Sequence, residues 1–210
     1  FPCMASEHYF TSQPASGSAL REITVHLGGR DVRLTTAGGV FSPDHIDVGT
    51  QVLFANSPAA PQDGDLLDLG CGWGPIALDL ALTAPEATVW AVDVNERALD
   101  LVRRNAATLG LSNVNAVTPE DVPEGLLFRT IRSNPPIRVG KNILHDMLMH
   151  WLPRLEPDSD AWLVVQRNLG SDSLQRWLQD ELPNTYGIVR AATGKGYRVL
   201  HVRKRTHHEH

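Results

Sequence analysis

Cysteine is scarce in this sequence of 210 residues, and its two copies lie in unrelated contexts. Cys3 belongs to the N-terminal stretch and Cys71 to a glycine-rich stretch, so neither a disulfide framework nor a metal site is expected, and a reducing cytoplasm fits. Long apolar runs are also missing, since none approaches the roughly 18 residues that span a membrane. The N-terminal stretch FPCMASEHYF lacks the basic region and apolar core of a signal peptide.

The two halves of the chain differ in charge. Residues 1–125 hold 6 Lys and Arg against 16 Asp and Glu, a net charge of −10, whereas residues 126–210 hold 13 against 8, a net charge of +5. The overall net charge of −5 therefore hides a basic C-terminal half, which can attract phosphate groups. A nucleic-acid partner is compatible with this distribution, and so is scattered surface charge.

Hydrophobic periodicity predicts an α/β fold. Residues 21–36 alternate in polarity around Gly28-Gly29, which indicates a β-hairpin, and a short helix is expected from about Thr50. Further on, strands are expected at 65–70, 88–94, 114–118, 126–133, 161–167, 186–192 and 196–204, and helices at 74–84, 95–110, 142–155 and 172–182. This alternation predicts a parallel sheet with helices on both faces, and the last two strands imply one antiparallel member near an edge. Asn95 is the expected N-cap of its helix, and Gly110 is expected to close it.

A single domain is expected over residues 22–204, with an extension at 1–21 that is partly disordered and a tail at 205–210. Within the domain, residues 22–57 would form the hairpin and a lead-in helix, and residues 63–204 the core. The hairpin is expected to cover the sheet.

His145 and His150 are five residues apart on one predicted helix and do not share a face well, so they do not indicate a metal pair.

A glycine-rich loop follows the first strand of the core. The stretch DLGCGWG places Gly70, Gly72 and Gly74 between a strand and a helix, where an open parallel sheet binds ligands. The spacing G-x-G-x-G differs from the G-x-G-x-x-G of dinucleotide-binding proteins, which disfavours an NAD-dependent dehydrogenase. Asp93 ends the second strand of the core, where a carboxylate can accept hydrogen bonds from both hydroxyls of a ribose.

The stretches DLLDLGCGWGPIAL and AVDVN resemble the first two motifs of class I S-adenosylmethionine-dependent methyltransferases. The resemblance implies a Rossmann-like sheet of seven strands and S-adenosylmethionine as cofactor. It also implies that Asp68 anchors the amino-acid end of the cofactor and that Asp93 binds the ribose. The other cofactor contacts implied by position are Gly70, Cys71, Gly72, Gly74, Val94 and Asp121, with Glu120 as the fallback for Asp121.

The stretch SNPPIRVGK follows the fourth strand of the core, and its two prolines end that strand. In this class of methyltransferase, a sequence of the type Asn-Pro-Pro-aromatic at this point marks enzymes that methylate a planar amine. The side-chain oxygen of Asn134 and the main-chain carbonyl of Pro135 could hold the two N–H groups of such an amine, while Pro135 and Pro136 fix the backbone. Ile137, Arg138 and Lys141 are the expected substrate contacts.

The stretch GGVFSPDHIDVGTQVL at residues 38–53, together with SNPPIRVGK, resembles the RsmC-like methyltransferase small domain family. The resemblance covers residues 22–204 and implies methylation of the exocyclic amine of guanine in small-subunit ribosomal RNA. It implies that Phe41 lies near the cofactor or the target base, and that Asp47, Gly49 and Thr50 help to close the cofactor site.

Two departures from the family pattern are visible. Family members with a fused, inactive N-terminal copy are about twice as long. Ile137 stands where an aromatic ring would stack on a flipped-out base; Trp73 and Trp151 are candidate replacements, although a core role is favoured for each.

Three other functions stay open: methylation of a protein glutamine, methylation of an adenine amine, and a non-catalytic RNA module that binds the cofactor. The expected partner is RNA in the cytoplasm, without a membrane, and the expected state is a monomer or homodimer.

Overall fold

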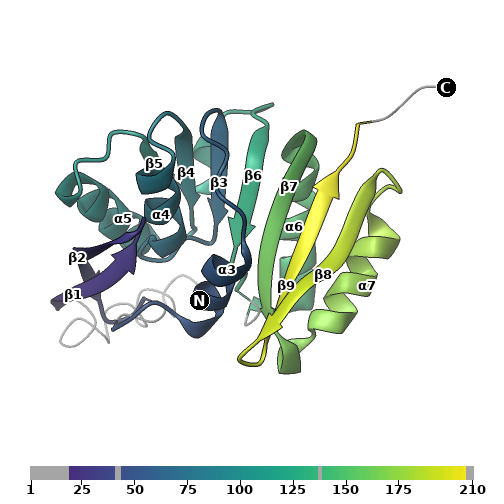
Figure 1. The fold of residues 1–210 in the computed structure, drawn as a ribbon, viewed down its shortest axis with the longest axis horizontal. Helices are drawn as coiled ribbons and strands as arrows, with labels where there is room; N and C mark the ends of the chain where they lie inside the picture. Colours follow the sequence, from purple (N-terminus) through teal and green to yellow (C-terminus); the bar gives the residue numbers. More distant parts are fainter. Residues whose placement is uncertain (1–18, 41–43, 137–138, 207–210) are drawn as a thin grey trace, which may run out of the picture.

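The computed structural model describes residues 19–40, 44–136 and 139–206 (Figure 1). Its strands are β1 (Leu20–Leu27), β2 (Arg30–Ala37), β3 (Asp65–Leu69), β4 (Thr88–Val92), β5 (Val114–Val117), β6 (Phe128–Ser133), β7 (Leu155–Gln166), β8 (Tyr186–Gly194) and β9 (Tyr197–Lys204). Its α-helices are α3 (Val48–Asn56), α4 (Pro75–Thr83), α5 (Glu96–Thr108), α6 (Lys141–Trp151) and α7 (Ser171–Glu181). Short 3₁₀ helices are η1 (Pro119–Asp121), η3 (Leu152–Arg154) and η4 (Arg167–Leu169).

Seven strands form one sheet in the order β5-β4-β3-β6-β7-β9-β8. The pairs among β3, β4, β5, β6 and β7 are parallel, whereas β9 is antiparallel to both β7 and β8. The prediction of a mostly parallel sheet with one antiparallel strand near its edge is confirmed. Because the chain runs outward from β3 on both sides, the carboxyl ends of β3, β4 and β6 meet at a topological switch point, where such sheets bind ligands.

Helices cover both faces of the sheet (Figure 1). The helices α3, α4 and α5 share one apolar core with the sheet, which includes Leu53, Leu80 and Leu99. The helices α6 and α7 share the other core, which includes Leu148 and Leu178. Since β3 and β4 are mostly buried on both faces, their sequences DLLDL and TVWAV are mostly apolar rather than alternating.

The β1–β2 hairpin packs on helices rather than on the sheet, so the expectation that it covers the sheet is wrong. Its apolar side chains join a third core with residues of α4 and α5, such as Leu78 and Leu101. The side chain of Asn105 on α5 fixes the contact, because it accepts from the Thr35 N–H at 2.7 Å and donates to the Thr35 carbonyl at 2.9 Å. The hairpin therefore stabilises the helices that flank the glycine loop.

Two predicted boundaries shift for identifiable reasons. The helix that begins at Lys141 stops at Trp151, because Pro153 lacks an N–H and the chain tightens into η3. The strand expected at 161–167 begins earlier, at Leu155, and the register against β6 shifts between Phe128 and Thr130. Asn95 caps α5 as predicted, accepting from the N–H groups of Arg97 and Ala98.

Candidate active site

The glycine loop and the Asn-Pro-Pro corner touch each other at the carboxyl edge of the sheet. The hydroxyl of Ser133 donates to the carbonyl of Leu69 at 2.6 Å and so joins the end of β6 to the end of β3. A Cβ added at Gly70 would lie 3.6 Å from Cδ of Pro136. The two motifs, which lie about sixty residues apart in the sequence, are therefore neighbours in the fold.

The backbone of the glycine loop leaves open space at its middle glycine. Gly72 has a φ of +55°, and a Cβ added there would meet no atom within 4 Å. Gly74 has a φ of +104°, and its added Cβ would lie 2.9 Å from Val102. Gly72 thus offers room for a ligand against the backbone, whereas Gly74 is required for the close approach of α4 and α5.

Cys71, the residue before Gly72, is buried. Its side chain is buried in the core with α4, and burial raises the pKa of the thiol well above its usual value, with the charges of Asp68 and Asp93 acting in the same direction. The N–H groups of Gly70 and Cys71 both donate to the carbonyl of Val92, at 2.8 and 3.0 Å. Cys71 is therefore a packing residue of the loop and an unreactive thiol.

Asp68 is a fully buried carboxyl group at the start of the site. Its Oδ2 accepts from the Ala77 N–H in the first turn of α4 at 2.9 Å, while Oδ1 has no hydrogen-bond partner among the described residues. Burial raises the pKa of Asp68 to about 8, against the hydrogen bond from Ala77, and the charge of Asp93 adds to the rise. A buried acceptor without a donor is costly, and a bound ammonium or hydroxyl would satisfy it.

Asp93 organises the backbone around the same space. Its Oδ2 accepts from the Gly72 N–H at 3.0 Å and its Oδ1 from the Asn95 N–H at 2.9 Å. A carboxylate can accept about four hydrogen bonds, so each oxygen keeps capacity for a hydroxyl donor. Val94, the next residue, is 82% exposed.

The two acidic residues expected near an adenine lie in η1. Asp121 and Glu120 are exposed, and the Oδ2 of Asp121 accepts from the Thr118 hydroxyl at 3.4 Å. Their place after β5 leaves them at the same edge as Asp93, and an adenine contact stays a prediction.

Asn134 is held in one orientation by Asp47, the N-cap of α3, and by Thr50 within that helix. Its Nδ2 donates to Oδ2 of Asp47 at 2.8 Å and to the hydroxyl of Thr50 at 3.2 Å. A carboxylate can only accept, so the NH₂ group must face Asp47. The Oδ1 of Asn134 has no hydrogen-bond donor among the described residues, and Pro135 is buried beside it. Thr50, which is expected to help close the cofactor site, contacts the Asn-Pro-Pro corner, and its contact with the cofactor stays a prediction.

Asp47 links this corner to α3. The same Oδ2 that binds Asn134 also accepts from the Gly49 N–H at 3.0 Å and so caps the helix. Tyr197, at the start of β9, packs against Gly49: a Cβ added there would lie 2.8 Å from the tyrosine ring. Sequence reasoning did not select Tyr197, because nothing local in GKGYRVL brings it next to residue 49.

The remaining expected site residues divide into three groups. Phe41, Ile137 and Arg138 lie outside the described residues. Lys141 is the exposed first residue of α6. Trp73 and Trp151 are 2% and 3% exposed and belong to apolar cores, so neither can stack on a substrate.

The histidines and acidic residues do not gather into a metal site in the described part of the chain. His145 stacks on Trp177 with ring centroids 3.6 Å apart, and His150 packs edge-on against Trp151. No helix within the described ranges is long and apolar enough to cross a membrane.

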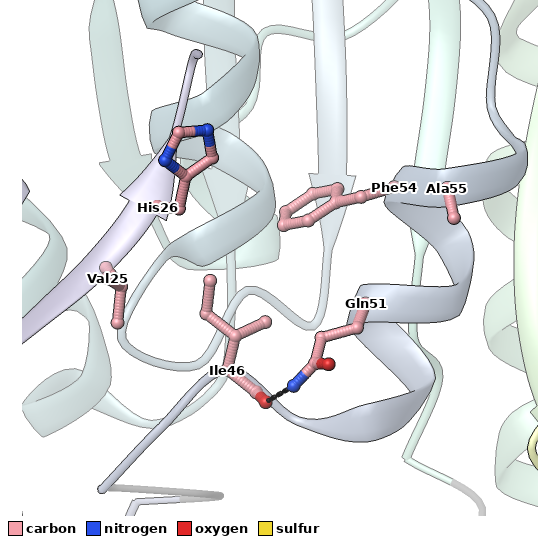
Figure 2. Close-up of a pocket in the computed structure, with 6 residues that line it drawn as sticks. All are labelled: Val25, His26, Ile46, Gln51, Phe54 and Ala55. Atoms are coloured by element: carbon pink, nitrogen blue, oxygen red, sulfur yellow. Dashed lines mark hydrogen bonds between the residues drawn. The ribbon is translucent and has the colours of Figure 1, made fainter. Parts of the chain in front are cut away.

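A shallow groove of about 550 Å³ lies between the hairpin and α3 (Figure 2). Its walls are mostly apolar, and the Gln51 side chain donates to the Ile46 carbonyl at 2.7 Å within it. The lining residues are Val25, His26, Ile46, Gln51, Phe54 and Ala55. None of the polar groups of the Asn-Pro-Pro corner lines the groove, so the groove is separate from the candidate active site.

The fold and this site define a class I methyltransferase, and the comparisons with known proteins specify the family. The chain matches the family described as "Methyltransferase small domain" over residues 31–201, and it belongs to that family. It is 33% identical to the uncharacterized protein YbxB of Bacillus subtilis, over 95% of this chain and 99% of that protein. It is 39% identical to ribosomal RNA small subunit methyltransferase C of Aeromonas hydrophila, over 54% of this chain and 32% of that enzyme.

A solved structure shares the fold. The 16S rRNA N2 methyltransferase RsmC of Thermus thermophilus, in complex with AdoMet and guanosine, aligns with a TM-score of 0.75 and 20% sequence identity. The alignment covers 95% of this chain and 62% of that chain. This chain therefore spans about a third of the Aeromonas enzyme and less than two thirds of the Thermus structure.

The cofactor of this class is S-adenosylmethionine, and the residues present fit it. The unpartnered Oδ1 of Asp68 can receive the ammonium of the amino-acid end, the space at Gly72 leaves room for the chain of the cofactor, and Asp93 can accept from the ribose hydroxyls.

Proposed function

We propose that this chain transfers a methyl group from S-adenosylmethionine to the exocyclic amine of a nucleobase, the acceptor being N2 of guanine in small-subunit ribosomal RNA. One observation carries the proposal: Asp47 and Thr50 bind the NH₂ side of Asn134 and leave Oδ1 as its free acceptor. A free acceptor oxygen at this position can receive a hydrogen bond from an N–H group of a substrate amine. The basic C-terminal half supports RNA as the partner.

The chemistry of such an amine explains the residue types. Its lone pair is delocalised into the ring, so it is a poor nucleophile. Hydrogen bonds from its two N–H groups to Asn134 Oδ1 and the Pro135 carbonyl would orient the nitrogen and stabilise the positive charge that develops on it. The bound cofactor supplies a methyl group on a positively charged sulfur, which is already a strong electrophile. The nitrogen would form the new bond to the methyl carbon as the carbon–sulfur bond breaks, S-adenosylhomocysteine would leave as a neutral thioether, and the nitrogen would then lose one proton.

The choice of guanine rests on the relatives. The Aeromonas relative is named a small-subunit ribosomal RNA methyltransferase, and the Thermus structure was solved with guanosine. Another relative, from Shewanella amazonensis, is named ribosomal RNA large subunit methyltransferase G, at 27% identity over 75% of this chain. We propose the small subunit, with the enzyme acting in the cytoplasm as a monomer or homodimer.

The experiment uses ribosomal RNA from cells that lack the gene, incubated with the protein and labelled S-adenosylmethionine. Mass spectrometry of the digested RNA should show methylguanosine at one small-subunit position. Asn134→Ala should reduce the transfer roughly 10²- to 10³-fold, the usual effect of removing one group that stabilises transition-state charge. Asn115→Ala, an exposed asparagine on β5, is the matched control and should keep full activity. Full activity of Asn134→Ala would contradict the mechanism, and a labelled adenine or protein would correct the substrate.

A further inference from the structure

Several cations of the basic C-terminal half are engaged within the protein. Arg129 pairs with Asp63 and Glu156, and Arg203 pairs with Asp160. Arg154 and Lys204 donate to main-chain carbonyls near the amino ends of β6 and β7. These four side chains lie toward the amino ends of the parallel strands, away from the candidate active site.

Two other cations lie at the carboxyl edge and are exposed. Arg167 directly follows β7, and Lys195 occupies the turn between β8 and β9 with a φ of +49°. The Arg167 N–H donates to the carbonyl of Gly196 at 2.8 Å, so the two segments are neighbours. Neither side chain has an ion pair with an acidic side chain in the described part of the chain. We refer to Arg167 and Lys195 as the cationic rim.

The rim is continuous with the catalytic corner. Tyr197 follows Lys195 by two residues, and in the sheet it pairs with Gln166, next to Arg167. The Tyr197 ring packs against Gly49, whose N–H binds Asp47, and Asp47 binds Asn134. A strand of substrate that places a base at Asn134 would therefore have its backbone close to the rim.

Electrostatics favours an anionic partner for the rim. Two exposed cations on neighbouring segments repel each other, and a bound cofactor would add a positive charge at the same edge. Six other arginines in the described part of the chain form ion pairs with carboxylates, such as Arg21 with Asp44 and Arg103 with Asp100, whereas Arg167 and Lys195 do not. Phosphate groups of a nucleic-acid backbone would neutralise the rim and gain from release of their counterions.

We propose that Arg167 and Lys195 bind the phosphates of the RNA strand that flanks the methylated nucleotide. This proposal rests on the proposed function, since it assigns the backbone contacts of the same substrate. Phosphate contacts position a substrate without reading its sequence, so the rim would raise the affinity for RNA and leave the chemical step unchanged.

The test is a double charge reversal, Arg167→Glu with Lys195→Glu. The matched control is Arg30→Glu with Arg104→Glu, two exposed arginines on β2 and α5 that also lack an ion pair in the described part of the chain. The assay measures methyl transfer to unmodified small-subunit ribosomal RNA at several salt concentrations. The rim variant should raise KM for RNA roughly 10- to 100-fold, keep kcat within about twofold, and lower the slope of log affinity against log salt by about 1 to 2.

The control pair should change KM by less than about threefold, because its charges lie away from the bound strand. Cofactor affinity, measured by calorimetry, should be equal in all three proteins. If the wild type is active on RNA and the rim variant has the same KM and salt slope, the proposal for the cationic rim is overturned and the proposed function stands. A wild type that transfers no methyl group to RNA would instead overturn the proposed function and the rim with it.

Discussion

Replacing Asp47 tests whether the orientation of Asn134 is a catalytic requirement. Asp47→Ala removes the acceptor that lies 2.8 Å from Asn134 Nδ2 and leaves only Thr50 at 3.2 Å. A hydrogen bond to a charged group contributes about 1.5–3 kcal/mol, and without it the amide can turn its NH₂ group toward the substrate. The amine would then meet a donor where it needs an acceptor.

The carboxylate also acts through its charge. A substrate nitrogen bound to Asn134 Oδ1 would lie about 7 Å from Asp47, and at an effective dielectric constant of about 20 a full positive charge there would be stabilised by about 2 kcal/mol. Since only part of that charge develops in the transition state, about 1 kcal/mol, or roughly fivefold in rate, is expected. Asp47→Asn keeps an acceptor oxygen but removes the charge, so its rate of methyl transfer should fall by this factor of roughly five. Asp47→Ala loses both effects and should lower kcat roughly 10- to 100-fold.

The assay is single-turnover methyl transfer to small-subunit ribosomal RNA with saturating enzyme and cofactor, well below the melting temperature. Asp47→Ala also removes the cap of α3, which costs about 1 kcal/mol of stability. Val52→Ala is therefore the control, because this buried residue lies in the same helix and makes no contact with Asn134 among the hydrogen bonds of the corner. Equal kcat values for Asp47→Ala and Val52→Ala would refute the reasoning.

Two further predictions concern the cofactor side of the site. In wild-type protein without cofactor, folded Asp68 keeps its proton up to a pH of about 8, because burial raises its pKa, whereas the unfolded chain releases the proton near 3.8. Between these values the folded state binds one more proton than the unfolded state. The stability of the wild type should therefore fall relative to that of Asp68→Asn as the pH rises from 5 to 8. A difference between their melting temperatures that does not change with pH would contradict the raised pKa of Asp68. Gly74→Ala should destabilise the fold by about 2 kcal/mol or more through its left-handed backbone and its clash with Val102, whereas Gly72→Ala should cost only about 1 kcal/mol and chiefly weaken cofactor binding. Thermal unfolding and calorimetric titration separate the two outcomes, and equal losses in both variants would count against a ligand at Gly72.

The elements of the fold were predictable because their signals are local. Apolar stretches alternate with helical segments from β3 to β7, and Asn95 caps α5 where its spacing from the apolar positions indicates. The antiparallel β9 followed from the absence of a helix between residues 192 and 196. The packing of the hairpin was not predictable, because an alternating strand has an apolar face whether its partner is a sheet or a pair of helices.

The chemistry that we propose for the corner comes from the residue types in SNPPIRVGK, whereas the orientation of the Asn134 amide could not be predicted from them. Residue types name the acceptor atoms, but which side of the Asn134 amide faces the substrate depends on Asp47, which is 87 residues away. Burial by itself would not fix this choice, since an amide has similar size and shape in both orientations and only a neighbour that exclusively accepts can distinguish its ends. An Asn-Pro-Pro sequence without such a neighbour would therefore keep the backbone of the corner and lose its preference for an amine, which makes Asp47 as informative about the reaction as Asn134 itself.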